Sequence, residues 1–109
     1  MNGYQRINAA LNRKWPDRRP IMLHNFMMAT REVGFTMKQY CTNPEYAAKA
    51  HIMAVEKYGL DGILWDIDTA VIASAVGSQV DYPENEPARI FGNCLKSLDQ
   101  VKDLEIQLL

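Results

Sequence analysis

The chain has 109 residues, of which 48% are hydrophobic and 23% charged, as is ordinary for one soluble globular domain. Its net charge of −1 and isoelectric point of about 6.1 give no reason to expect a nucleic acid or an anionic membrane as partner. No apolar run is long enough to span a membrane and the opening residues lack a secretory pattern, so we expect a cytoplasmic protein.

The first third of the chain predicts a helix, a strand and a second helix. Residues 3–13 carry apolar side chains at helical spacing, and residues 15–17 (WPD) end that pattern. The short apolar segment 20–25 predicts a buried strand, and residues 26–33 predict another helix. Gly34 suits the left-handed position that follows a helix end.

A longer helix is predicted from Asn43 to about Tyr58. Asparagine caps the free backbone N–H groups at a helix start, and Pro44 fits the first turn. Gly59 is expected to end the helix. Small residues on one face would allow close packing against a sheet; they are Ala47, Ala50 and Ala54.

The second half of the chain predicts further strands and short helices. Residues 62–67 (GILWDI) are apolar up to their acidic end, which predicts a strand buried on both faces of a parallel sheet. A short helix is expected from Asp68 or Thr69 to Gly77, followed by strands at 80–82 and 89–91. A last helix begins at Ser97, with its inward residues expected to be Leu98, Val101 and Leu104. This alternation predicts an α/β fold with βαβ units.

Two aspartates at the end of the 62–67 strand are candidate site residues. Asp66 and Asp68 lie two positions apart, so on a strand they point to the same side. Two such carboxylates can share a proton, accept N–H donors or hold a cation. The alternative is structural: Asp68 caps the following helix, and Asp66 forms an ion pair with an arginine.

His24 and Asn25 end the first predicted strand and are the other candidates. A histidine there can bind a metal or act as acid or base, and the alternative is a hydrogen-bonded, half-buried side chain. Arg18 and Arg19 precede this strand, so we expect a structural role or an ion pair with a surface carboxylate.

Other conspicuous side chains are expected to be structural. The methionines are predicted to fill the core, as is Trp65, whereas His51 is expected to be partly exposed on its helix. Cys41 and Cys94 lack the spacing of a metal site, so free thiols are expected and zinc is not.

Four segments, taken in order, resemble the opening of the uroporphyrinogen decarboxylase and cobalamin-dependent methyltransferase superfamily. They are residues 6–22 (RINAALNRKWPDRRPIM), 34–50 (GFTMKQYCTNPEYAAKA), 58–87 (YGLDGILWDIDTAVIASAVGSQVDYPENEP) and 97–104 (SLDQVKDL). The resemblance implies a (β/α)₈ barrel, a fold that takes about 250 residues. Residues 1–109 would then be a truncated N-terminal segment: a partial barrel holding the first strands and helices only.

The resemblance also implies a function. In the decarboxylases an aspartate after the second strand binds the pyrrole N–H groups of the substrate, and counting back from Gly77 places it at Asp68. Asp66, His24 and Asn25 would line the same pocket. The decarboxylases carry an arginine-rich segment after the first strand, whereas residues 23–28 (LHNFMM) contain no arginine.

That departure favours the branch that resembles methylcobalamin:coenzyme M methyltransferases, which transfer a methyl group between a corrinoid and a thiol. The partner of the full enzyme would be a corrinoid protein or, in the alternative, a small-molecule tetrapyrrole that is decarboxylated. Corrinoid and a catalytic zinc are implied for the full enzyme, but this chain holds no cofactor site of its own, because the family's zinc ligands come later. Alone, the chain is expected to be inactive and to form a homo-oligomer through its exposed sheet edge, or to associate with a partner subunit.

Overall fold

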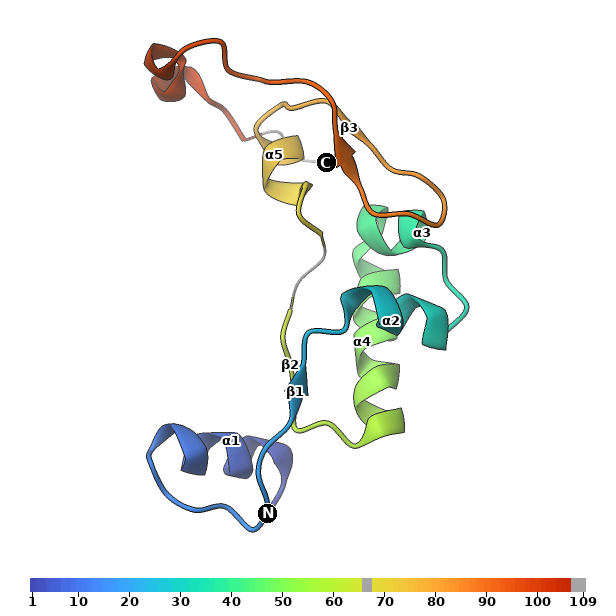
Figure 1. Ribbon diagram of the computed structural model, residues 1–109, viewed down its shortest axis with the longest axis vertical. Helices are drawn as coiled ribbons and strands as arrows, with labels where there is room; N and C mark the ends of the chain where they lie inside the picture. The colour runs from blue at the N-terminus through green and yellow to red at the C-terminus, as the bar shows by residue number, and fades with distance from the viewer. Residues whose placement is uncertain (66–67, 107–109) are drawn as a thin grey trace.

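The computed structural model describes residues 1–65 and 68–106, which form helices and two small sheets (Figure 1). In chain order the elements are α1 (Gly3–Leu11), β1 (Met22–Leu23), α2 (Phe26–Glu32), α3 (Met37–Thr42), α4 (Pro44–Tyr58), β2 (Gly62–Ile63), α5 (Val71–Ala75), β3 (Val80–Asp81), β4 (Arg89–Ile90) and the 3₁₀ helix η1 (Leu98–Asp103). The predicted mixed α/β character is confirmed. The described residues form no closed barrel, so the barrel stays a prediction.

The two sheets have different topologies. β1 and β2 pair in parallel, with Met22 opposite Gly62 and Leu23 opposite Ile63, as a βαβ connection requires. β3 and β4 instead pair antiparallel as a hairpin, with Val80 opposite Ile90. The hairpin lies in the half of the molecule away from α1, near α3, and η1 forms the far end (Figure 1).

The predicted boundaries of α4 are confirmed. The Asn43 side chain accepts a hydrogen bond from the backbone N–H of Glu45 at 2.9 Å, and Pro44 occupies the first turn. Gly59 ends the helix in the left-handed conformation, with φ 61°. Its alanine face packs mainly on α2 and α3 and only secondarily on β2, because the buried cluster joins Ala47, Ala50 and Ala54 to Ala29, Met37 and Tyr40.

Several predictions about burial were wrong. Ile63, Leu64 and Trp65 are exposed, although the 62–67 strand was expected to be buried on both faces. The reason is that, among the described residues, β1 and β2 pair only with each other, and α2 and α4 lie on one side of the pair (Figure 1). Among the methionine side chains described, only Met37 is buried, and Leu98 and Val101 of η1 face solvent. No described helix combines the length and apolar character that crossing a bilayer requires.

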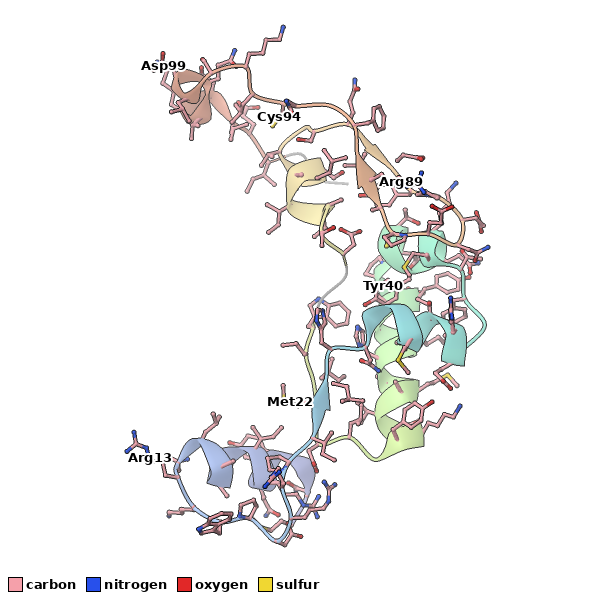
Figure 2. The ribbon with its side chains drawn as sticks, viewed as in Figure 1. Arg13, Met22, Tyr40, Arg89, Cys94 and Asp99 are labelled. Atoms are coloured by element: carbon pink, nitrogen blue, oxygen red, sulfur yellow. The ribbon has the colours of Figure 1, made fainter. Side chains whose placement is uncertain are left out.

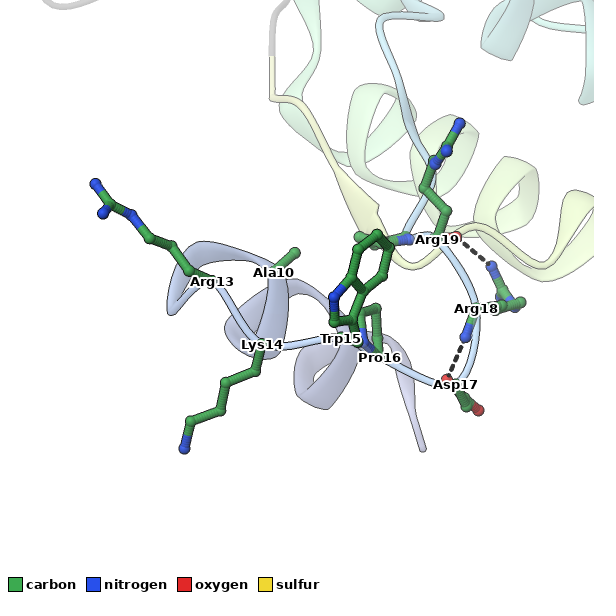
Figure 3. A pocket seen from close by; sticks show the side chains of 9 residues that line it. Ala10, Arg13, Lys14, Trp15, Pro16, Asp17, Arg18 and Arg19 are labelled. Atoms are coloured by element: carbon green, nitrogen blue, oxygen red, sulfur yellow. Dashed lines mark hydrogen bonds between the residues drawn. The ribbon is translucent and has the colours of Figure 1, made fainter.

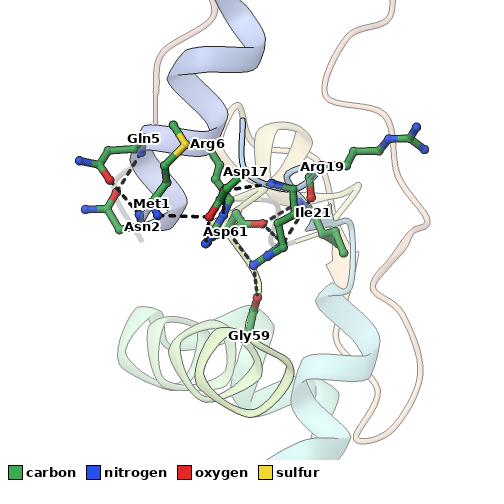
Figure 4. A network of polar contacts seen from close by, with 10 residues as sticks. Met1, Asn2, Gln5, Arg6, Asp17, Arg19, Ile21, Gly59 and Asp61 are labelled. Carbon is green, nitrogen blue, oxygen red and sulfur yellow. Dashed lines mark hydrogen bonds and ion pairs between the residues drawn. The ribbon is translucent and has the colours of Figure 1, made fainter. Parts of the chain in front are cut away.

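An ion network holds α1 and the segment after it to the start of β2 (Figure 4). The side chain of Asp61 is only 1% exposed and accepts hydrogen bonds from Arg6 at 3.0 Å and from Arg18 at 2.7 and 3.0 Å. Its Oδ2 also accepts from the backbone N–H of Ile21 at 2.9 Å. Arg6 in addition bonds both oxygens of Asp17, at 2.7 and 2.9 Å. The predicted ion pair of Arg18 is confirmed, but its carboxylate is buried instead of lying at the surface.

We expect this network to make the chain sensitive to acid. The Ile21 N–H and the two guanidinium groups lower the pKa of Asp61, and Arg6 lowers that of Asp17. Because both pKa values lie below those of the unfolded chain, about 3.9, their stabilisation is complete above that pH and is lost as the pH falls further. Melting temperatures measured from pH 7 to pH 2.5 should therefore fall more steeply for the wild type than for Asp61→Asn. Parallel curves would contradict this.

Candidate functional site

The parallel pairing of β1 and β2 places the ends of both strands, which precede predicted site residues in the sequence, at one edge of the sheet. His24 and Asn25 directly follow β1, and the segment that follows β2 leads to Asp68. Parallel strands present their carboxyl ends at the same edge, which is where ligands bind in α/β proteins. Asp66, the fourth predicted site residue, lies outside the described residues.

The two residues after β1 differ in accessibility. His24 is exposed, whereas Asn25 is buried at the N-cap position of α2. The backbone carbonyl of Asn25 accepts a hydrogen bond from the N–H of Ala29 at 2.7 Å, but the amide side chain caps nothing. His24 can therefore be reached by a ligand in this chain, and Asn25 is held as part of the turn into α2.

Asp68 is 8% exposed and uses its two carboxylate oxygens differently. Oδ1 accepts hydrogen bonds from the backbone N–H groups of Ala70 at 2.7 Å and Val71 at 2.6 Å. The helix was predicted to start at Asp68 or Thr69, but α5 begins at Val71 with Ala70 in the N-cap position, so Asp68 bonds its first N–H groups from two residues before the cap. Oδ2 is buried and has no hydrogen-bond partner among the described residues. A buried carboxylate oxygen without a full partner is costly, and the Cys41 thiol beside this carboxylate is only a weak donor, so Oδ2 can accept a further hydrogen bond from a ligand.

The Cys41 thiol on α3 is a neighbour of this carboxylate. Burial, together with the nearby Asp68 carboxylate, raises the pKa of Cys41 to about 12. The thiol therefore stays protonated at neutral pH and is a poor nucleophile or metal ligand. Within the described ranges no three histidine, cysteine or acidic side chains gather as a metal site would require. These residues do not fit a zinc ion.

A cavity of about 570 Å³ lies elsewhere, between the end of α1 and the loop before β1 (Figure 3). It is lined by Ala10 and by the segment from Arg13 to Pro20. This is the amino end of β1, opposite to the edge that carries His24 and Asp68. The cavity therefore does not belong to the candidate site.

A comparison with models of known protein families identifies the family to which the chain belongs. The family model described as uroporphyrinogen decarboxylase (URO-D) matches residues 2–108. The chain belongs to the uroporphyrinogen decarboxylase family. Searches among curated proteins and among solved structures gave no match. The family resemblance of the four segments is thus confirmed over nearly the whole chain.

In this member of the uroporphyrinogen decarboxylase family, the sequence did not predict a buried polar pair beside the candidate site. The Tyr40 hydroxyl lies 2.7 Å from Nε2 of His51, and both side chains are almost fully buried between α3 and α4 (Figure 2). The His51 ring also lies 5.2 Å from the Trp65 ring, centre to centre. The expectation that His51 is partly exposed was wrong.

Two sequence signals pointed to this pair. His51 lies one turn after Ala47 and three residues before Ala54, so it belongs to the same helical face as the buried alanines. Thr36 and Gln39 form a capping box that starts α3, the helix that carries Tyr40. The match to the uroporphyrinogen decarboxylase family predicts neither the burial of His51 nor the start of α3, because a family match shows sequence relationship and not contacts.

Proposed function

We propose that this chain supplies the Asp68 side of a ligand pocket in a corrinoid-dependent methyltransferase of the uroporphyrinogen decarboxylase family. One observation carries the proposal: Oδ2 of Asp68 is buried, unpaired among the described residues and located after β2. A ligand N–H would satisfy it, either a pyrrole N–H of a reduced tetrapyrrole or a peripheral amide N–H of a corrinoid. His24, and Asp66 by its place in the sequence, would line the same pocket, with Asn25 shaping the turn.

The distribution of charged residues favours the methyltransferase function over the decarboxylase function. A decarboxylase of this family must bind a substrate rich in carboxylates, and residues 23–28 offer no arginine for them. Residues 68–106, which follow the strand edge, hold seven acidic and three basic side chains. A negative surface repels a polycarboxylate but leaves an amide-rich corrinoid unaffected. Tetrapyrrole decarboxylation is the alternative.

The ligands of a zinc ion would have to come from outside the described residues. The thiol of Cys41 is protonated at neutral pH, and no set of three ligands forms. We therefore assign no step to zinc in this chain. Its own contribution is to bind and orient the ligand through the Asp68 carboxylate, which accepts hydrogen bonds.

The test compares Asp68→Asn with the wild-type chain. Asparagine keeps an Oδ1 acceptor for Ala70 and Val71 but replaces Oδ2 with an N–H₂ donor, so the start of α5 is retained while the ligand contact is lost. Binding of methylcobalamin and of uroporphyrin, followed by absorbance, should weaken by roughly 10-fold or more, since a hydrogen bond to a charged group is lost.

The matched control is Asp103→Asn, which changes an exposed aspartate and should bind like the wild type. Equal affinities of wild type and Asp68→Asn for both probes, or no binding by the wild-type chain, would contradict the proposal. A clear preference for uroporphyrin over methylcobalamin would favour the decarboxylase alternative.

A further inference from the structure

Helix α3 lies close to the segment that leads from β2 to Asp68, although the two are far apart in sequence. The Tyr40 hydroxyl on α3 lies 2.7 Å from Nε2 of His51, and the His51 ring lies 5.2 Å from the ring of Trp65. Trp65 follows β2 and stands three positions before Asp68. These contacts hold the Tyr40 face of α3 near the segment that carries Asp68.

Cys41 lies on the inner side of the same helix. It is half-buried and packs against the buried cluster that contains Met37 and Tyr40. Because Cys41 is one turn after Met37, the two side chains share a face of α3. The raised pKa of the Cys41 thiol, which has the Asp68 carboxylate among its causes, agrees with a sulfur that lies beside this carboxylate.

The Asp68 carboxylate has one oxygen that lacks a full partner. Oδ1 accepts two backbone N–H groups, whereas Oδ2 has no hydrogen-bond partner among the described residues, and the side chain is more than nine-tenths buried. A buried acceptor in this state binds whichever donor reaches it, and water competes with a ligand for the place. The side chain that lies beside the carboxylate therefore affects how well a ligand can bind there.

A cysteine and a serine would affect Oδ2 in opposite ways. A hydroxyl group is a strong donor and would satisfy the oxygen from within the protein. A protonated thiol is a weak donor and behaves largely as a small apolar group. It can shield the oxygen from water while it leaves most of the acceptor capacity unused.

We propose that Cys41 is a positioning residue of the Asp68 pocket, whose thiol shields Oδ2 from water and leaves it able to accept a ligand N–H. The ligand donors are the pyrrole or amide N–H groups already considered for Asp68. The proposal rests on the proposed function, and it adds the side chain that controls the strength of the Asp68 contact. It requires Cys41 to stay protonated and assigns it no nucleophilic step.

Two substitutions of Cys41 test this role through binding of methylcobalamin and uroporphyrin, followed by absorbance. Cys41→Ser keeps the size of the side chain but adds a strong donor, so the affinity should fall roughly 5-fold to 10-fold. Cys41→Val keeps an apolar group without a donor and should stay within about 2-fold of the wild type. If Cys41 only filled space, valine, which differs more in shape, would be the more damaging change. Cys94→Ser, between β4 and η1, is the control and should bind like the wild type.

A second measurement needs no ligand and reports the contact itself. The chain has two cysteines, so Cys41 is the single thiol in a Cys94→Ser background, and its reaction with a disulfide reagent follows the amount of thiolate. Asp68→Asn removes the carboxylate and should make this reaction at pH 9 roughly 5-fold faster or more. In the matched Cys41→Val chain, where Cys94 is the single thiol, Asp68→Asn should leave the rate unchanged. That comparison excludes a general loosening of the fold.

The two measurements distinguish failure of this proposal from failure of the proposed function. An unchanged Cys41 rate in Asp68→Asn would mean that the thiol does not lie against the carboxylate, and would overturn the proposal whichever probe binds. A faster rate together with wild-type affinity in Cys41→Ser would overturn it too, while the ligand contact of Asp68 would stand. A wild-type chain that binds neither probe would overturn both, and a faster thiol reaction would then show a contact without a role in binding.

Discussion

Replacing Asp61 with alanine should lower the melting temperature of the chain on the order of 10 °C, or prevent folding altogether. The substitution leaves two arginines facing each other without their shared carboxylate and removes the acceptor of the Ile21 N–H. α1 and the loop up to Pro20 would then lose their attachment to β2. Thermal unfolding followed by circular dichroism measures the effect.

Two further variants separate charge from packing at this position. Asp61→Asn keeps the shape and one acceptor oxygen, so it should fall between the wild type and Asp61→Ala. Asp103→Ala removes an exposed aspartate and should leave the melting temperature nearly unchanged. If Asp61→Ala melted like Asp103→Ala, the network would have no role in holding residues 1–21 against the start of β2.

The second large effect is expected at Tyr40, where alanine should reduce the free energy of unfolding by about 3–5 kcal/mol. Tyr40 is 1% exposed and is the largest side chain in a core otherwise made mainly of alanine. Its loss would leave a void between α3 and α4 that alanines cannot fill. Urea unfolding gives the difference directly.

Tyr40→Phe distinguishes the ring from its hydroxyl group. It keeps the packing and removes only the contact with His51, so we expect a loss of about 1 kcal/mol. Tyr4→Ala on the exposed side of α1 is the control and should change stability by less than about 0.5 kcal/mol. An equal loss in Tyr40→Phe and Tyr40→Ala would mean that the hydrogen bond, and not the ring, dominates.

Local signals in the sequence predicted where helices and strands lie better than they predicted what packs against them. Asn43, Pro44 and Gly59 define α4 through backbone chemistry that acts within one turn, so both ends of this helix were predicted. The burial of residues 62–65 depends on what lies against the strand, and apolar character alone cannot report that a covering layer is missing. The β3–β4 hairpin was missed as a pairing because its two short strands are separated by a polar loop without a hairpin signature.

The candidate site was predicted in part. Asp68 was predicted either to cap a helix or to contact a ligand; its Oδ1 bonds the N–H groups at the start of α5, although Ala70 holds the N-cap position, and the ligand contact stays a prediction. The contribution of α3 was not predicted, because the approach of Cys41 to Asp68 joins residues 27 positions apart. Such contacts between residues far apart in the chain leave no periodic pattern in the sequence.

The Arg18–Asp61 contact has a consequence for the order in which the chain folds during synthesis. The two residues lie 43 positions apart, and β1 must likewise wait for β2, its partner 40 residues later. Until Asp61 leaves the ribosome, Arg18 lacks its carboxylate partner, Arg6 can bond only Asp17, and β1 has nothing to pair with. Helices α2 to α4 can form meanwhile from local contacts, and the amino-terminal lobe should be the last of these parts to become protected from protease.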